Sequence, residues 1–152
     1  MFHEVVEDGT VSGGGETPDA DEIRSTALLA AFEALVSESV AEAGRGRVAD
    51  ETGVDEASIE AAAGGDVAEL SVTDGAAIVA VTADRDAETI VAELRDHLLL
   101  GMATAVLDVD TIAAGIDADL TGQEVQQALE GRAGMTLEQL AEIMAVIERR
   151  KR

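Results

Sequence analysis

The chain has 152 residues, no cysteine and a formal net charge of −22, from 32 acidic and 10 basic residues. Without cysteine it can form neither a disulfide nor a thiolate metal site. So large an acidic excess suits a cytoplasm with molar salt, where the Debye length is about 3 Å, and predicts a salt-accumulating halophile. The alternative is a mesophilic acidic or disordered protein, and disorder is disfavoured because 47% of the residues are hydrophobic.

The amino terminus, Met1–Val5, lacks the basic and apolar regions of a signal peptide. The most apolar run, Leu98–Leu107, is shorter than the about 20 residues that a membrane-spanning helix needs. We therefore expect a cytoplasmic protein with no membrane segment.

Residues 1–18 are predicted to form a flexible, acidic and glycine-rich leader. A short strand over Glu4–Val6 would have no evident partner, and the triple glycine Gly13–Gly15 is not followed by the Gly-Lys-Ser/Thr of a phosphate loop. The leader is therefore interpreted as a tether.

The first half, residues 19–84, has the pattern of four helices. A long helix capped by Asp19 or Asp21 should run to about Glu42, with apolar residues at spacings of three and four. Gly53 is suited to the positive φ of a tight turn. The remaining helices are expected over Arg47–Thr52, over Glu56–Ala63 after the cap Asp55, and from Thr73 or Asp74 through Ala76, Ile78 and Val81.

The second half, residues 85–152, repeats this order. Asp86 caps a helix, a short helix follows near Thr111–Ala118, and Thr121 with Glu124 forms a capping box. A second capping box, Thr136 with Gln139, opens the last helix. The apolar side of the long helix is expected to consist of Ile90, Val91, Leu94, Leu98, Met102 and Val106.

The two halves align at a shift of 66 residues, which becomes 65 from Ser71 onward. The aligned pairs combine apolar residues, small residues and turns, which indicates a duplication. They include Leu28 with Leu94, Phe32 with Leu98, Val36 with Met102, Val40 with Val106, Ile59 with Val125, Gly65 with Gly131, Ser71 with Thr136 and Ile78 with Ile143. The predicted fold is all-α, with two pseudo-repeated four-helix, helix-turn-helix-like units packed into one compact helical domain.

Each unit resembles the Cro/C1-type repressor domain, a helix-turn-helix family. The first copy carries the resemblance at Val48, Ala49, Gly53, Val54, Ile59 and Gly65, and the second over Ala114–Val125 and Gly131. In the second copy Asp119 stands where the first has the turn glycine, and aspartate tolerates left-handed backbone. The whole chain also resembles a family of small acidic haloarchaeal proteins without a known activity.

The resemblance implies that the second motif helix reads DNA in the major groove. The first copy offers Glu56 and Glu60 there, which repel phosphate. The second offers the better set, since glutamine bonds bidentately to adenine and arginine binds phosphate. The candidate DNA-binding residues are Gln123, Gln126, Gln127 and Arg132. The alternative is that they form a solvated polar face, because Glu124 and Glu130 lie on the same helix.

The sequence gives weak signals for catalysis and for metals. His3 lies in the leader, His97 lies within a helix beside apolar residues, and Asp108 and Asp110 are explained as helix caps. No catalytic residue, cofactor or metal is predicted, and an enzyme without a recognisable motif is the weakest alternative.

The predicted function is that of a helix-turn-helix transcription regulator bound to double-stranded DNA. The alternative is a helical module that does not bind DNA and that dimerises or docks a protein partner. The two differ in whether the three glutamines project outward beside arginines or are covered by other helices.

Overall fold

The computed structural model describes residues 2, 18–83, 85–116, 120–130 and 134–150, with the backbone alone for residues 18–23. These residues form eight helices and no strand, so the prediction of a compact all-α fold is confirmed. The helices are α2 (Pro18–Ala43), α3 (Arg45–Thr52), α4 (Glu56–Ala63), α5 (Val72–Thr82), α6 (Ala87–Ala105), α7 (Val109–Gly115), α8 (Gly122–Leu129) and α9 (Leu137–Arg150).

Several of the helices begin at the caps that local sequence predicts. The Asp55 carboxylate accepts a hydrogen bond from the Ser58 backbone N–H and opens α4. The hydroxyl of Thr121 accepts from the Glu124 N–H, while the Glu124 carboxylate accepts from the Thr121 N–H, which completes a capping box at α8. As a result α4 and α8 begin and end 66 residues apart.

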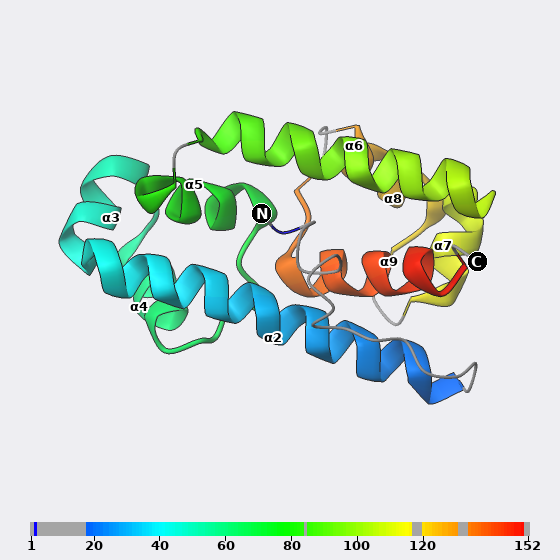
Figure 1. Ribbon diagram of the computed structural model, residues 1–152, viewed down its shortest axis with the longest axis horizontal. Coiled ribbons are helices and arrows are strands. Elements are labelled where there is room, and N and C mark those ends of the chain that lie inside the picture. Colours follow the sequence, from blue (N-terminus) through cyan, green and yellow to red (C-terminus); the bar gives the residue numbers. More distant parts are fainter. Residues whose placement is uncertain (1, 3–17, 84, 117–119, 131–133, 151–152) are drawn as a thin grey trace.

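The two halves are related by an approximate twofold axis, and Figure 1 looks nearly along it. Ser71 and Thr136 form an antiparallel bridge, in which the Val72 N–H donates to the Met135 carbonyl and the Leu137 N–H donates to the Leu70 carbonyl. A shift of 65 residues exchanges these two hydrogen bonds. The long helices α2 and α6 lie on opposite sides, and each packs on both α5 and α9, which lie between them.

The buried side chains form one continuous core shared by the halves. Ile59 and Val125, which the repeat predicts as equivalent anchors of α4 and α8, are both buried, with 2% and 0% of their surface exposed. Because α2 packs on α9 and α6 packs on α5, neither half buries its apolar face without the other.

One residue of the predicted leader belongs to the core. Phe2 is 1% exposed, and its ring meets the ring of Phe32 edge to face with centroids 5.2 Å apart. This position differs from the prediction of a free tether from residue 1 onward. The strand considered at Glu4–Val6 lies outside the described residues.

The start of α2 and of α5 differs slightly from the prediction. Helix α2 begins at Pro18, so Asp19 and Asp21 lie inside its first turn, where proline is favoured and negative charge is favourable. Helix α5 begins one residue earlier than expected, because the Ser71 hydroxyl accepts from the Asp74 N–H and caps it.

The end of α6 is the main correction to the predicted repeat. The repeat aligns Val106 with Val40 and predicts both on the buried side of their helices. Val106 instead takes a left-handed conformation after the last turn of α6 and is 89% exposed, whereas Val40 is 2% exposed. Helix α7 then begins at Val109 rather than near Thr111, because the Asp108 carboxylate accepts from the Thr111 N–H and caps it.

In the described part of the chain, no single helix is long and apolar enough to cross a membrane. Helices α6 and α7 reach that length and composition only as a pair, and the break between them is bent by 94°.

Candidate functional site

Of the four residues predicted to bind DNA, the structure describes three, and these differ in how exposed they are. Gln123 and Gln126 are exposed on α8, Gln127 is half-buried, and Arg132 lies outside the described residues. The Gln126 side-chain amide donates to the Glu130 carboxylate across 2.9 Å, and Glu130 is exposed as well. Acidic side chains therefore share the outer face of α8 with the glutamines.

The connections within the two helix pairs are unequal. In the first half three residues, 53–55, join α3 to α4, and Gly53 has a φ of 74°. In the second half residues 116–121 join α7 to α8. Helix-turn-helix motifs use turns of about three to four residues. The tight connection and the glutamine-bearing helix are thus found in different halves.

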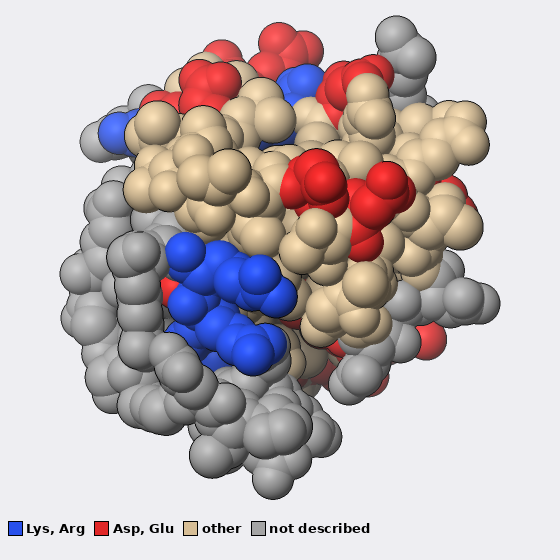
Figure 2. Space-filling view, turned by 90° about the vertical axis from the view of Figure 1, so that its right-hand side faces the viewer, with Lys and Arg blue, Asp and Glu red and all other residues tan. Residues whose placement is uncertain are grey.

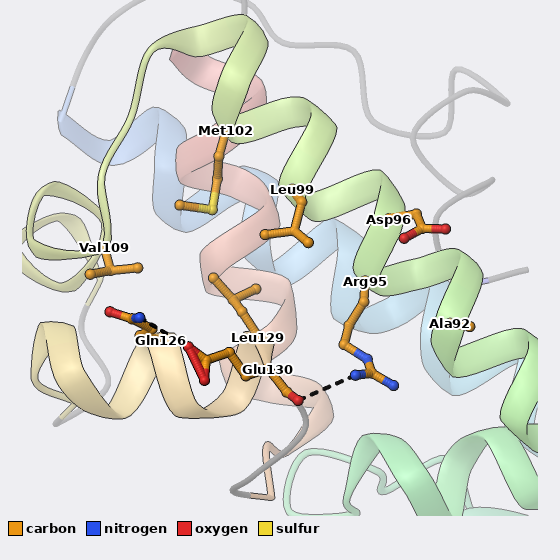
Figure 3. A pocket seen from close by; sticks show the side chains of 9 residues that line it. All are labelled: Ala92, Arg95, Asp96, Leu99, Met102, Val109, Gln126, Leu129 and Glu130. Atoms are coloured by element: carbon orange, nitrogen blue, oxygen red, sulfur yellow. Dashed lines mark hydrogen bonds between the residues drawn. The ribbon is translucent and has the colours of Figure 1, made fainter.

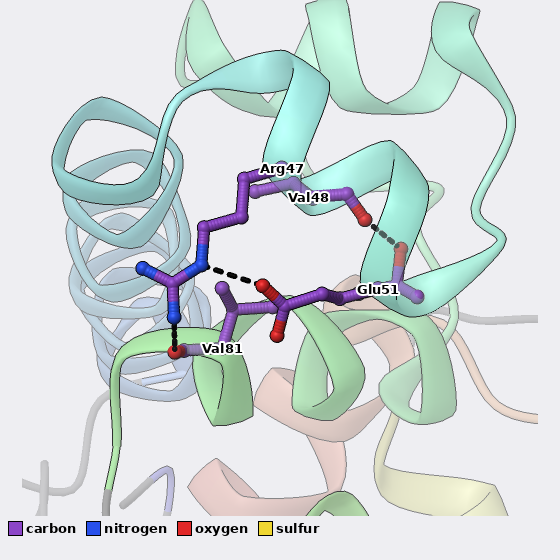
Figure 4. Close-up of polar contacts among 5 residues, drawn as sticks. Arg47, Val48, Glu51 and Val81 are labelled. Atoms are coloured by element: carbon purple, nitrogen blue, oxygen red, sulfur yellow. Dashed lines mark hydrogen bonds and ion pairs between the residues drawn. The ribbon is translucent and has the colours of Figure 1, made fainter.

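Helix α3 is fixed to its own half by an apolar contact and by arginines. Val48 is completely buried, the Arg47 guanidinium donates to the Glu51 carboxylate and to the Val81 carbonyl of α5, and Figure 4 shows it between them. Arg45 reaches the Glu60 carboxylate of α4 at 3.4 Å. This pair is exposed and contributes little by itself.

A groove with a volume of about 600 Å³ separates α6 from α8. Figure 3 shows Leu99 and Met102 descending from α6 toward Leu129 of α8, with Val109 of α7 at one end. The α6–α8 groove is lined by Ala92, Arg95, Asp96, Leu99, Met102, Val109, Gln126, Leu129 and Glu130. Its floor is apolar, and its rim carries two acids, one arginine and one amide.

The rim arginine has one unsatisfied donor. One terminal nitrogen of Arg95 donates to the Glu130 backbone carbonyl at 3.3 Å, whereas its Nε is buried and has no hydrogen-bond partner. This hydrogen bond joins α6 to the end of α8 across the groove (Figure 3).

The exposed large apolar side chains of the described residues lie near the end of α6. In the described part of the chain they are Leu99, Leu100 and Val106, with 50%, 68% and 89% of their surface exposed. All three lie in the last two turns of α6 or directly after it. Of the three, Leu99 lines the α6–α8 groove, whereas Leu100 and Val106 are not part of its lining.

Basic side chains gather at the end of the molecule where α9 terminates, as Figure 2 shows. Arg149 and Arg150 form the last turn of α9, where positive charge is favourable against the helix dipole. His97 of α6 lies 4.0 Å from the Glu148 carboxylate of α9 and is half-buried.

The titratable groups with shifted pKa values are helix caps. A hydrogen bond from the Ser58 side chain lowers the pKa of Asp55, and backbone N–H donors of Thr89 and Thr111 lower the pKa values of Asp86 and Asp108. Within the described residues no group of three or more histidine, aspartate or glutamate side chains is placed to hold a metal ion.

The α6–α8 groove was missed by the sequence analysis. Its one available signal is the run Leu98-Leu99-Leu100, since three consecutive leucines on a helix cannot all face one core. Leu98 is buried, and the other two project outward.

Residues 28–150 match a protein family described as a family of unknown function, DUF5791. No curated protein and no solved structure matches the chain.

Proposed function

Because the chain belongs to this family of unknown function, we propose a function from the features of its surface. The protein is a helical protein-interaction module without catalysis, and it binds a protein partner in the α6–α8 groove. The observation that carries the proposal is the apolar floor of this groove, in which Leu99 has half of its surface exposed and Met102 and Val109 are half-buried. Grouped exposed aliphatic residues are typical of interaction surfaces.

Leaving these apolar side chains in water is unfavourable. Full burial of a leucine side chain is worth roughly 1.5–3 kcal/mol, and Leu99 still has half of its surface to bury. Met102 and Val109 are half-buried in the same groove and would lose further exposed surface. A partner that covers these side chains gains this free energy.

Binding to double-stranded DNA is the second candidate, and the exposure of Gln123 and Gln126 on α8 favours it. Against it stand the tie between Gln126 and Glu130 and the acids on the same helix. Molar salt screens their repulsion of phosphate, but it also removes most of the gain from counterion release.

DNA retention in molar KCl tests the second candidate, with Gln126→Ala and Arg132→Ala as comparison variants. DNA binding predicts retention that both substitutions weaken. If the protein retains no DNA sequence, or if neither substitution changes the retention, DNA binding is excluded.

Photo-crosslinking in the native host tests both candidates in one experiment. A benzophenone-bearing amino acid replaces Gln126, which lines the groove and also belongs to the candidate DNA set. The matched control carries the same group in place of Ala41, an exposed residue of α2. A discrete protein adduct from position 126 that is absent from position 41 supports the interaction module. An adduct with DNA, or identical products from the two positions, overturns it.

A further inference from the structure

We infer that the α6–α8 groove accepts a short helix with arginines beside an aliphatic residue, supplied by a partner protein and seated much as α3 is seated in the first half. The inference rests on the function proposed above and names the chemistry of the partner. Its basis is the approximate twofold symmetry, which allows the two halves to be compared position by position.

In the first half the first short helix, α3, packs on the long helix, whereas among the described helices of the second half its counterpart α7 does not. In the first half α3 packs along α2, and Val36 and Val40 near the end of α2 are 0% and 2% exposed. Their counterparts in the second half are Met102, which is half-buried, and Val106, which is 89% exposed. Among the described helices α6 and α7 do not pack on each other, because the chain turns by 94° between them.

Helix α3 therefore indicates the size and chemistry of what would cover α6. It is eight residues long, buries one aliphatic side chain, Val48, and carries Arg45 and Arg47 beside it. Arg45 meets a carboxylate of α4, and Arg47 meets the end of α5. A helix of this kind matches the mode in which an amphipathic helix binds in an apolar groove.

Charge complementarity favours arginines in the occupant. Asp96 and Glu130 are exposed on opposite walls of the groove, and the chain as a whole carries a net charge of −22. We expect a guanidinium on a docked helix to pair with one of these carboxylates, as Arg45 pairs with Glu60 of α4 in the first half. An acidic helix would face repulsion from the same groups.

The test uses the full chain and two fluorescein-labelled synthetic helices. Both peptides carry leucines at i, i+3 and i+7, one with flanking arginines and the other with glutamates at the same positions. Fluorescence anisotropy is measured at the lowest KCl concentration that keeps full helicity, and again at higher KCl. The test variant is Leu99→Gln, and the matched control is Leu100→Gln, on the same helix, similarly exposed and outside the groove lining.

We expect saturable binding of the arginine peptide, weakened about five- to tenfold by Leu99→Gln and less than about twofold by Leu100→Gln. The glutamate peptide should bind at least about tenfold more weakly, and the difference should shrink as salt screens the charges. Asp96→Asn should reduce the affinity for the arginine peptide alone.

Equal affinity for the two peptides overturns the charge assignment, and equal effects of the two leucine variants overturn the groove. Self-association in sedimentation that Leu99→Gln abolishes would show that a second copy, and not a basic helix, fills the site. If neither peptide binds while position 126 still gives a discrete protein adduct, the inference fails and the proposed function stands. If that adduct is also absent, both fail.

Discussion

Replacing Phe2 by alanine tests whether the first residues of the chain contribute to the core. Phe2 is 1% exposed, Phe32 is fully buried, and their rings meet at an interplanar angle of 71°. Truncation of a buried phenylalanine typically costs about 3–5 kcal/mol, and an edge-to-face pair contributes about 0.5–1.5 kcal/mol beyond its buried area. Because domains of this kind unfold with about 5–15 kcal/mol, Phe2→Ala should remove a large share of the stability.

Urea unfolding at constant KCl, followed by far-ultraviolet circular dichroism, measures this loss. Phe2→Ala, Phe32→Ala and the double variant form a cycle, and we expect a coupling energy of about 0.5–1.5 kcal/mol. Leu100→Ala, at a residue that is 68% exposed, serves as the surface control and should change the stability by less than about 0.5 kcal/mol. A cost below about 1 kcal/mol for Phe2→Ala, together with zero coupling, would refute the placement of Phe2 in the core.

Four further predictions concern two glycine substitutions, pH and salt. Gly122→Ala should destabilise the protein by about 1–3 kcal/mol in the same urea assay, because the added Cβ would lie 3.2 Å from the backbone Cα of Asp110 and would also displace the Asp110 side chain. Gly46→Ala, in open space within α3, should stabilise it by about 0.5–1 kcal/mol, and a loss there would contradict the helix assignment. Hydrogen bonds from Thr89 lower the pKa of Asp86, so its charged cap stabilises the fold above the ordinary carboxyl pKa and loses this effect as the pH falls through the lowered value. Relative to Asp86→Asn, which keeps a cap that does not titrate, the native chain should therefore lose stability below about pH 4, and parallel pH profiles would be evidence against this account. Lowering KCl to about 0.1 M should unfold the chain, because acidic repulsion then acts over about 10 Å, whereas unchanged helicity would end the halophile argument.

Features that depend on neighbouring residues were predicted well from the sequence. The caps at Asp55, Asp86 and Thr121 are satisfied within three residues, so the pattern alone specifies where α4, α6 and α8 begin. The anchors Ile59 and Val125 followed from the repeat, since each holds the same place in its own short helix.

Features that depend on distant contacts were not predicted. Val40 and Val106 are the same residue type at aligned positions, but they differ in exposure. Val40 lies within α2, which packs on α3, whereas Val106 follows the last residue of α6, which does not pack on α7. The direction in which α7 leaves α6 decides this for Val106, and periodicity along α6 carries no information about it. The groove and the burial of Phe2 are missed for the same reason, because they are formed by segments far apart in sequence.

The pair of hydrogen bonds that joins Ser71 to Thr136 has a consequence for how such a chain can arise. Since a half-turn exchanges the two bonds, a separate polypeptide equivalent to one half could make both with an identical copy. A substitution in such a homodimer would alter both subunits at once, so neither subunit could lose its cover alone. Fusion into one chain removes that constraint. The first half can keep α3 packed on α2, while the second half is free to change independently.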